Sequence, residues 1–294
     1  MAFNWSGHQA HCNQVAQDLG EWVGLLDENF LPIMDLPQRI DMSWPDARGA
    51  IDSVMMRIRV RTPSGRLHAV VRELVAENLG VVDSYGELIP VTGPARFVRM
   101  EAADKDPWTM RVTHVEVEGD AELPHTLTIH GVTMEAYLDL LPCPSNPVTW
   151  DGEYTRFTRD WVGPEGEQEL FTQPRDLSSC TMIAVADGAS VDGDSDVVIH
   201  RLIKESIDAV HRVIDPETLA DGPVYVAVLG ERRAASRRLI LRPTDQTLWK
   251  EVGDAALASG VGIRADLWFP GSPQPSPDLT LTAPTIIFTV RQEA

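Results

Sequence analysis

Three arginines at alternate positions are the residues whose type and spacing point most directly to a function. In Met56-Arg-Ile-Arg-Val-Arg61, apolar residues alternate with Arg57, Arg59 and Arg61, which predicts a half-buried strand with one charged face. No acidic residue interrupts the segment from Arg57 to Arg72. On a chain with a formal net charge of -19, this face suits an acidic neighbour or a second copy of the chain. The three arginines are therefore candidate subunit-interface residues. The alternative is a strand face that is exposed only to solvent.

Histidines and cysteines occur in one short cluster. The segment His8-Gln-Ala-His-Cys12 carries three ligand-type side chains within five positions. A structural zinc ion needs four ligands, and no second cluster completes the set. His200 and His211 lie on one expected helix without a carboxylate at ligand spacing. Surface or interface histidines are therefore expected, and no metal ligand is assigned.

The acidic segment Asp187-Gly-Ala-Ser-Val-Asp-Gly-Asp-Ser-Asp196 has oxygen donors at alternate positions, as calcium loops do. Counting from Asp192, the sixth position is Val197 instead of glycine and the twelfth is Ile203 instead of glutamate. These departures exclude an EF-hand. A looser cation site and a solvated loop that leads into a helix cap are the two interpretations left open.

The segment Gly260-Val-Gly-Ile-Arg-Ala265 fits the dinucleotide-binding pattern G-x-G-x-x-G/A. That pattern works only where a strand leads into the glycines and a helix opens from them, so that the helix N-terminus faces a pyrophosphate. Here a predicted helix comes first and a strand follows, which makes Gly260 a helix C-cap. No nucleophile elbow, P-loop or His-Glu-x-x-His motif is present. We therefore expect no enzyme activity, no catalytic residue and no cofactor.

Composition indicates a globular protein with a real core. The chain has 294 residues, of which 43% are hydrophobic and 23% charged. The acidic balance argues against direct, sequence-specific nucleic-acid binding, which normally requires a basic surface. Three widely spaced cysteines, Cys12, Cys143 and Cys180, predict reduced thiols in a cytoplasm. We expect no signal peptide and no membrane span, because no long apolar run occurs.

Hydrophobic periodicity predicts a strand-rich α+β protein. Helices are expected at residues 8–34, 133–141, 195–214 and 247–258, and residues 67–79 form either a strand or a short helix. Strands are expected at residues 56–61, 98–100, 109–117, 126–130, 224–229, 237–242, 261–269 and 285–290. Gly131 is expected to break the strand before it, and Asp194 or Ser195 to cap the helix at 195–214.

A proline cluster, Leu141-Pro-Cys-Pro-Ser-Asn-Pro147, marks the expected domain boundary, since prolines stiffen extended linkers. The predicted organisation is an N-terminal helical or extended segment at 1–40, a β-rich domain at 41–147 and an α+β domain at 148–294. The first segment folds either alone or on a partner.

Several segments together resemble a known family. They are Leu127-Thr-Ile-His-Gly131, Leu138-Asp-Leu-Leu-Pro142, Asp160-Trp161, the stretch from Trp249 to Pro275, and Leu281-Thr-Ala-Pro-Thr-Ile-Ile-Phe-Thr-Val290. Most specific is Leu267-Trp-Phe-Pro-Gly-Ser-Pro-Gln-Pro275. Over most of residues 40–290 the chain resembles the minor tail proteins of actinobacteriophage siphoviruses, which are related to the N-terminal hub region of tail-associated lysins.

The resemblance implies a structural virion protein at the tail tip, assembled in the host cytoplasm. Such proteins form a ring, typically threefold, of small β-barrel-like hub domains with inserted helices. The implied partners are other copies of the chain, the distal tail protein, the tape measure protein and other minor tail proteins. Many relatives continue into further domains, some of which degrade peptidoglycan, and none is expected here because the sequence ends at Ala294. A distal-tail or receptor-binding protein is the alternative, and a cell-wall hydrolase is a third.

Overall fold

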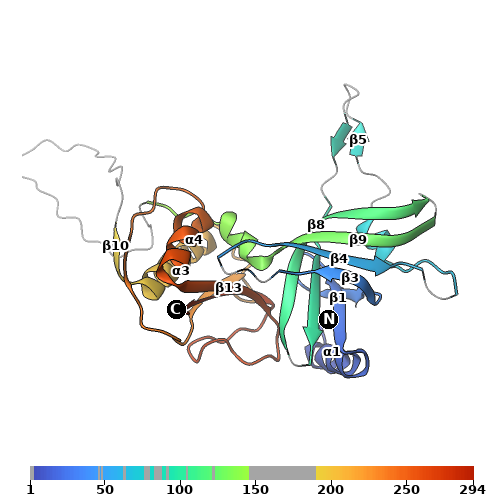
Figure 1. Ribbon diagram of the computed structural model, residues 1–294, viewed down its shortest axis with the longest axis horizontal. Coiled ribbons are helices and arrows are strands. Elements are labelled where there is room, and N and C mark those ends of the chain that lie inside the picture. Colours follow the sequence, from blue (N-terminus) through green and yellow to red (C-terminus); the bar gives the residue numbers. More distant parts are fainter. Residues whose placement is uncertain are drawn as a thin grey trace, which may run out of the picture.

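The computed structural model describes residues 3–45, 47, 49–61, 64–75, 80–82, 88–90, 93–103, 105–120, 123–145 and 190–294. Cys180, the pair Asp160-Trp161 and Asp187 therefore lie outside the described residues. Two layers are joined side by side: a large curled sheet, and a smaller sheet covered by helices (Figure 1). The fold is strand-rich α+β, as expected.

The N-terminal helix is shorter than predicted. Helix α1 (Trp5–Leu19) begins at Asn4, whose side chain accepts a hydrogen bond from the amide of Gly7, and it ends at Gly20 with φ of 88°. The chain then enters strand β1 (Glu21–Leu26). The expectation of a helix over 8–34 is wrong beyond residue 19. Helix α1 covers one face of β1 and a core cluster covers the other, so residues of both faces are apolar. The alternation of apolar and polar residues that identifies a half-buried strand is therefore missing.

The large sheet has seven antiparallel strands in the order β2-β1-β7-β8-β9-β4-β3 and curls into a half-barrel (Figure 1). Its other strands are β2 (Pro32–Asp35), β3 (Arg39–Ser43), β4 (Ser53–Arg59), β7 (Phe97–Ala102), β8 (Lys105–Asp120) and β9 (Leu123–Thr133). Helix α2 (Val70–Leu74) follows β4, and β5 (Gly80–Val82) pairs with β6 (Leu88–Pro90) in a hairpin that projects from the sheet.

The alternating pattern of β4 is confirmed, because Val54, Met56 and Ile58 are fully buried. The prediction that Gly131 breaks its strand is wrong, since β9 continues to Thr133. A Cβ atom at Gly131 would lie 2.6 Å from the carbonyl oxygen of Arg111 on β8. The glycine therefore permits a close approach of two strands instead of ending one.

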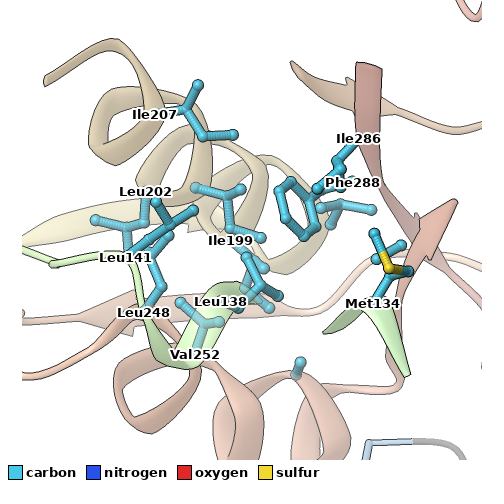
Figure 2. Close-up of a cluster of buried hydrophobic side chains, with 14 of the residues drawn as sticks. Met134, Leu138, Leu141, Ile199, Leu202, Ile207, Leu248, Val252, Ile286 and Phe288 are labelled. Atoms are coloured by element: carbon cyan, nitrogen blue, oxygen red, sulfur yellow. The ribbon is translucent and has the colours of Figure 1, made fainter. Parts of the chain in front are cut away.

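The C-terminal layer packs helices on a three-stranded sheet in the order β11-β14-β13. Its elements are the 3-10 helix η1 (Met134–Asp139), β10 (Val191–Asp194), α3 (Ser195–His211), β11 (Tyr225–Leu229), β12 (Arg238–Leu241), α4 (Leu248–Ser259), β13 (Val261–Trp268) and β14 (Thr285–Gln292). Side chains of η1, α3, α4 and β14 converge in one cluster (Figure 2).

Helix α3 is confirmed, although its end differs from the prediction. Ile199, Leu202 and Ile203 are buried as the expected stripe requires. Val213, also assigned to that stripe, is 84% exposed because the helix ends at His211. The amide of Val213 bonds to the carbonyl of Val210, a tighter i to i-3 turn that rotates the chain off the stripe.

The two layers share a core. The cluster that holds α3 and α4 also contains Leu26, Phe30 and Phe97 from the curled sheet. The expected boundary after residue 40 falls inside β3, and strands on both sides of it belong to one sheet. The expected boundary after residue 147 borders residues that are not described, so it stays a prediction. Among the described residues, no helix has the length and apolar character needed to cross a membrane.

Candidate functional site

The arginine strand lies near one edge of the curled sheet. Strand β4 pairs with β9 on one side and with the edge strand β3 on the other. Because Met56 and Ile58 point into the core, Arg57 and Arg59 project from the opposite face of the sheet. Arg61 lies two residues beyond the end of the strand and forms an isolated bridge with Leu67.

Arg57 is engaged within the chain. Its guanidinium pairs with the carboxylate of Glu118 on β8, which also accepts a hydrogen bond of 2.7 Å from the hydroxyl of Thr126. The hydrogen bonds from Thr126 and from Arg57 lower the pKa of Glu118 below its ordinary value. Glu118 therefore largely neutralises the charge of Arg57. The three arginines are not equivalent, and Arg57 is the least available to a partner.

Arg59 and Arg61 instead line a hollow of about 500 Å³. The lining consists of Pro37, Gln38, Arg39, Ile40, Arg59, Arg61 and His68, none of which is acidic. Arg39 is held by Glu21 through two hydrogen bonds of 2.5 and 2.9 Å, and Arg61 donates to the carbonyl of Gly65 at 3.0 Å. Arg59 is exposed. We call these seven residues the basic hollow, and its charge suits a carboxylate or another anion.

The edge strand β3 lies beside the basic hollow. Its inner side pairs with β4, and its outer side faces no strand among those that the structure describes. An edge strand offers unpaired amide and carbonyl groups to a segment of another chain. Ile40 of β3, 47% exposed, adds an apolar contact at the same place. The edge strand and the basic hollow thus place unpaired backbone groups beside three arginine side chains.

A wide cleft of about 710 Å³ separates the curled sheet from β13 and η1. Trp44 and Trp108 meet in it with ring centroids 5.3 Å apart, and Trp268 lies in its wall. Five carboxylic residues line it, and burial raises the pKa of two of them, Glu135 and Asp266. Glu135 accepts a hydrogen bond of 2.8 Å from the amide of Ala265, which gives it a structural role in joining η1 to β13.

The N-terminal histidine cluster is divided by its surroundings. His11 pairs with Asp35 at 2.7 Å, while the sulfur of Cys12 lies 3.4 Å from Nε2 of His8. Cys12 is buried, and burial raises the pKa of its thiol to about 12. A thiol with this pKa stays protonated near neutrality, so it is neither a nucleophile nor a ready metal ligand.

The described part of the acidic segment is neutralised by arginines. Asp192 pairs with Arg238, and Arg232 pairs with Asp194 and Asp196 at 2.7 and 2.6 Å. Asp194 holds the N-cap position of α3, but its carboxylate binds Arg232 instead of capping the helix. The three aspartates of this segment that the structure describes are therefore already paired with arginines, and Asp187 lies outside the described residues.

The glycine motif has the order of elements that the sequence predicted. Helix α4 leads into Gly260, which adopts φ of 80° as the C-cap, and β13 follows. A helix that ends at the motif presents carbonyl groups there, whereas a pyrophosphate needs amide groups. The motif therefore caps a helix.

Sequence reasoning missed a group on the exposed face of the sheet: His114 and Glu116 of β8 and His130 of β9. The alternation His-x-Glu within one strand placed the first two on one face. Nothing in the sequence placed His130 opposite His114, because that neighbourhood depends on the pairing of β8 with β9.

No protein-family model and no curated protein matches the sequence. Among solved structures, the chain is similar to the crystal structure of the tail protein from Neisseria meningitidis MC58, with 12% sequence identity and a TM-score of 0.34. The similarity covers 92% of this chain and 50% of that chain, so this chain spans half the length of that protein. A TM-score this low does not establish a common fold.

Proposed function

We propose that the chain is a structural, non-enzymatic protein of a tailed-phage virion and forms part of the hub at the tail tip. Support comes from the resemblance to minor tail proteins and from the role of the residues that carry it. The supporting observation is that the most specific stretch, Leu267 to Pro275, joins parts of the fold.

Hydrogen bonds, an aromatic stack and a cation–π contact make this stretch a junction. The indole of Trp268 donates to the carbonyl of Pro273 at 2.8 Å, and the side chain of Gln274 exchanges two hydrogen bonds with the backbone of Leu281. Phe269 stacks on Trp5 of α1 at 4.9 Å. The guanidinium of Arg99, from β7, lies 4.4 Å from the Phe269 ring centroid. These contacts join α1, β7 and the end of β13, which gives the stretch a structural role in the fold.

Assembly uses the edge strand β3 and the basic hollow. A closed ring with more than two members needs two different patches on one chain. The hollow supplies a basic patch on a protein with a net charge of -19, so an acidic surface of a neighbouring copy or of the distal tail protein is the natural counterpart. The trimer and the other tail partners follow from the resemblance.

The assembly proposal is tested by light scattering and negative-stain imaging of the purified chain at low and high salt. We expect a ring that weakens as salt rises, because exposed charges are screened. Arg59→Gln with Arg61→Gln should prevent ring formation, whereas Arg57→Gln should leave it intact because Arg57 already pairs with Glu118. A folded double variant that assembles like the parent at low salt would show that the basic hollow is only solvated.

The virion proposal is tested separately. Antibodies against the purified chain should label the tail tip of the phage that encodes it, in electron micrographs. Label on the capsid or along the tube, or no label on intact virions, contradicts a tail-tip location. The proposed lack of enzyme activity is tested by zymography, in which clearing of a host cell-wall gel would overturn it.

One observation favours a second candidate, a module that binds the host surface. Trp44 and Trp108 meet at the cleft, and paired aromatic rings beside polar groups suit a flat, polar ligand such as a saccharide. Trp108→Ala should then weaken binding of the purified chain to host cells without preventing ring formation. Unchanged binding by this variant would leave the hub as the sole candidate function.

A further inference from the structure

Two histidines and a glutamate meet on the exposed face of the curled sheet. His114 of β8 and His130 of β9 are directly opposite each other, and their rings stack with centroids 4.3 Å apart and planes inclined by 5°. Glu116 lies two residues after His114 and therefore on the same face. One ligand atom from each of the three lies within 4.8 Å of the other two.

A bulge fixes the ring of His114. The register of β8 against β9 shifts between Val112 and His114, which leaves Thr113 without a partner residue in the ladder. The hydroxyl of Thr113 lies 3.1 Å from Nδ1 of His114 and donates to the carbonyl of His130 at 3.2 Å. Histidines that bind metals are commonly held in this way, with one ring nitrogen hydrogen-bonded and the other facing the ion.

The second histidine carries an unsatisfied nitrogen. Nε2 of His130 is buried and has no hydrogen-bond partner among the described residues, and the nearest carboxylate oxygen, of Glu116, lies 3.5 Å away. A buried polar atom without a partner is destabilising. The side chain as a whole is 27% exposed, so an ion from solvent can reach it.

Charge at the site favours a cation. Arg57 of β4 projects from the same face but pairs with Glu118. The carboxylate of Glu116 instead lies beside His130. Glu116 is exposed at 64% of its side chain, so it reorients without moving the backbone. Imidazole nitrogen and carboxylate oxygen are ligands that zinc and its neighbours in the transition series accept together.

We propose that His114, Glu116 and His130 bind one divalent transition-metal ion and leave an open coordination position for water. Metal–ligand bonds of about 2.0–2.1 Å place tetrahedral ligand atoms roughly 3.3 Å apart. Because the two rings stack in parallel, their in-plane nitrogen lone pairs do not yet converge on one point. Thr113 holds the ring of His114, so binding requires the ring of His130 and the side chain of Glu116 to rotate toward Nε2 of His114. Such an ion ties β8 to β9 where the bulge interrupts their pairing.

The test uses the full chain, stripped with chelator and then titrated with zinc chloride by calorimetry. We expect one zinc ion per chain and a higher melting temperature with zinc. His114→Asn and His130→Asn should weaken binding at least about tenfold, and Glu116→Gln should weaken it less because two imidazoles remain. The matched control is His125→Asn. His125 is exposed and lies on β9 with His130, but outside the cluster.

Cobalt gives a readout that does not depend on stability. Bound Co²⁺ should show visible absorption bands of low-symmetry coordination in the parent and in His125→Asn, and lose them in His130→Asn. Glu116→Gln alters an exposed side chain, so it reports on the site even if a histidine variant fails to fold. The proposal is overturned if zinc binds only at millimolar concentration, or if binding survives in His130→Asn and is lost in His8→Asn with Cys12→Ser.

Discussion

The curled sheet and the C-terminal layer place their charged residues in different ways. On the sheet, Arg57 and Glu118 pair across strands while both side chains remain substantially exposed, at 39% and 53%. In the C-terminal layer the carboxylate of Asp196 is completely buried at the start of α3. It accepts hydrogen bonds from Arg232 at 2.6 and 2.9 Å and from the hydroxyl of Ser236 at 2.8 Å.

This difference follows from how each layer covers its core. Around β4, β8 and β9 the curled sheet has one apolar face and leaves the other to solvent, where charges need no partner to be tolerated. The C-terminal layer covers its small sheet with helices, so the polar start of α3 is enclosed and must be satisfied internally. Charges on the solvent face of the sheet, such as Arg59, are thus available for recognition, whereas Asp196 at α3 maintains the fold. Arg99 of β7, buried where the sheet meets β13, also maintains the fold.

The largest effect is expected from Leu202→Asp in α3. Leu202 is 2% exposed within the cluster of Figure 2, so the variant places an unpaired charge in the core. We expect the free energy of unfolding to fall by about 4–5 kcal/mol or more, which is enough to unfold a domain of ordinary stability. Circular dichroism during urea unfolding measures it. Val197→Asp, at a 41% exposed position of the same helix, is the control and should melt close to the parent.

Phe97→Ala tests whether the two layers unfold together. Phe97 belongs to β7 of the curled sheet but is buried in the cluster that contains α3 and α4, and its ring meets Phe30 at 4.7 Å. Truncation of this side chain should lower the free energy of unfolding by about 3–4 kcal/mol, because packing contacts are lost. Because the core is shared, tryptophan fluorescence and far-UV circular dichroism should shift to lower denaturant together. Two separated transitions would show that the layers are independent.

Asp196→Asn examines the buried charge and its dependence on pH. Burial tends to raise the pKa of Asp196, but hydrogen bonds from Arg232 and Ser236 outweigh it and lower the pKa below its ordinary value. The parent therefore holds this stabilisation above pH ~4 and loses it as pH falls through the lowered pKa. We expect the free energy of unfolding of the variant to be about 1–3 kcal/mol lower than that of the parent at neutral pH. Thermal melts from pH 7 to pH 3 should show the difference shrinking in acid; a constant difference contradicts this explanation.

The smallest effect is expected from Arg57→Gln. Its ion pair with Glu118 is exposed, and such pairs contribute little to folding. The melting temperature should stay within experimental error of the parent at moderate salt. A large decrease would mean that exposed cross-strand charges also hold the fold, which would remove the distinction between the two layers.

Local pattern in the sequence was enough for several elements. The alternation at 56–61 predicted β4, the apolar stripe predicted α3, and Gly260 after an apolar helix predicted its cap. Each depends on residues within a few positions of one another, where backbone geometry acts directly. The same reasoning failed at β1, because coverage of both faces of a strand is a property of the fold and leaves no period of two.

The candidate sites depend on pairing that the sequence does not contain. Residue types and alternation determined that Arg57 and Arg59 share an exposed face, and that the chain is acidic elsewhere. Only the tertiary structure decided that Glu118 satisfies Arg57, that Arg59 and Arg61 line a hollow with Arg39, and that His130 lies opposite His114. Register between strands fixes these neighbours, and a single bulge at Thr113 changes which residues meet, so the contacts arise from the assembled sheet as a whole.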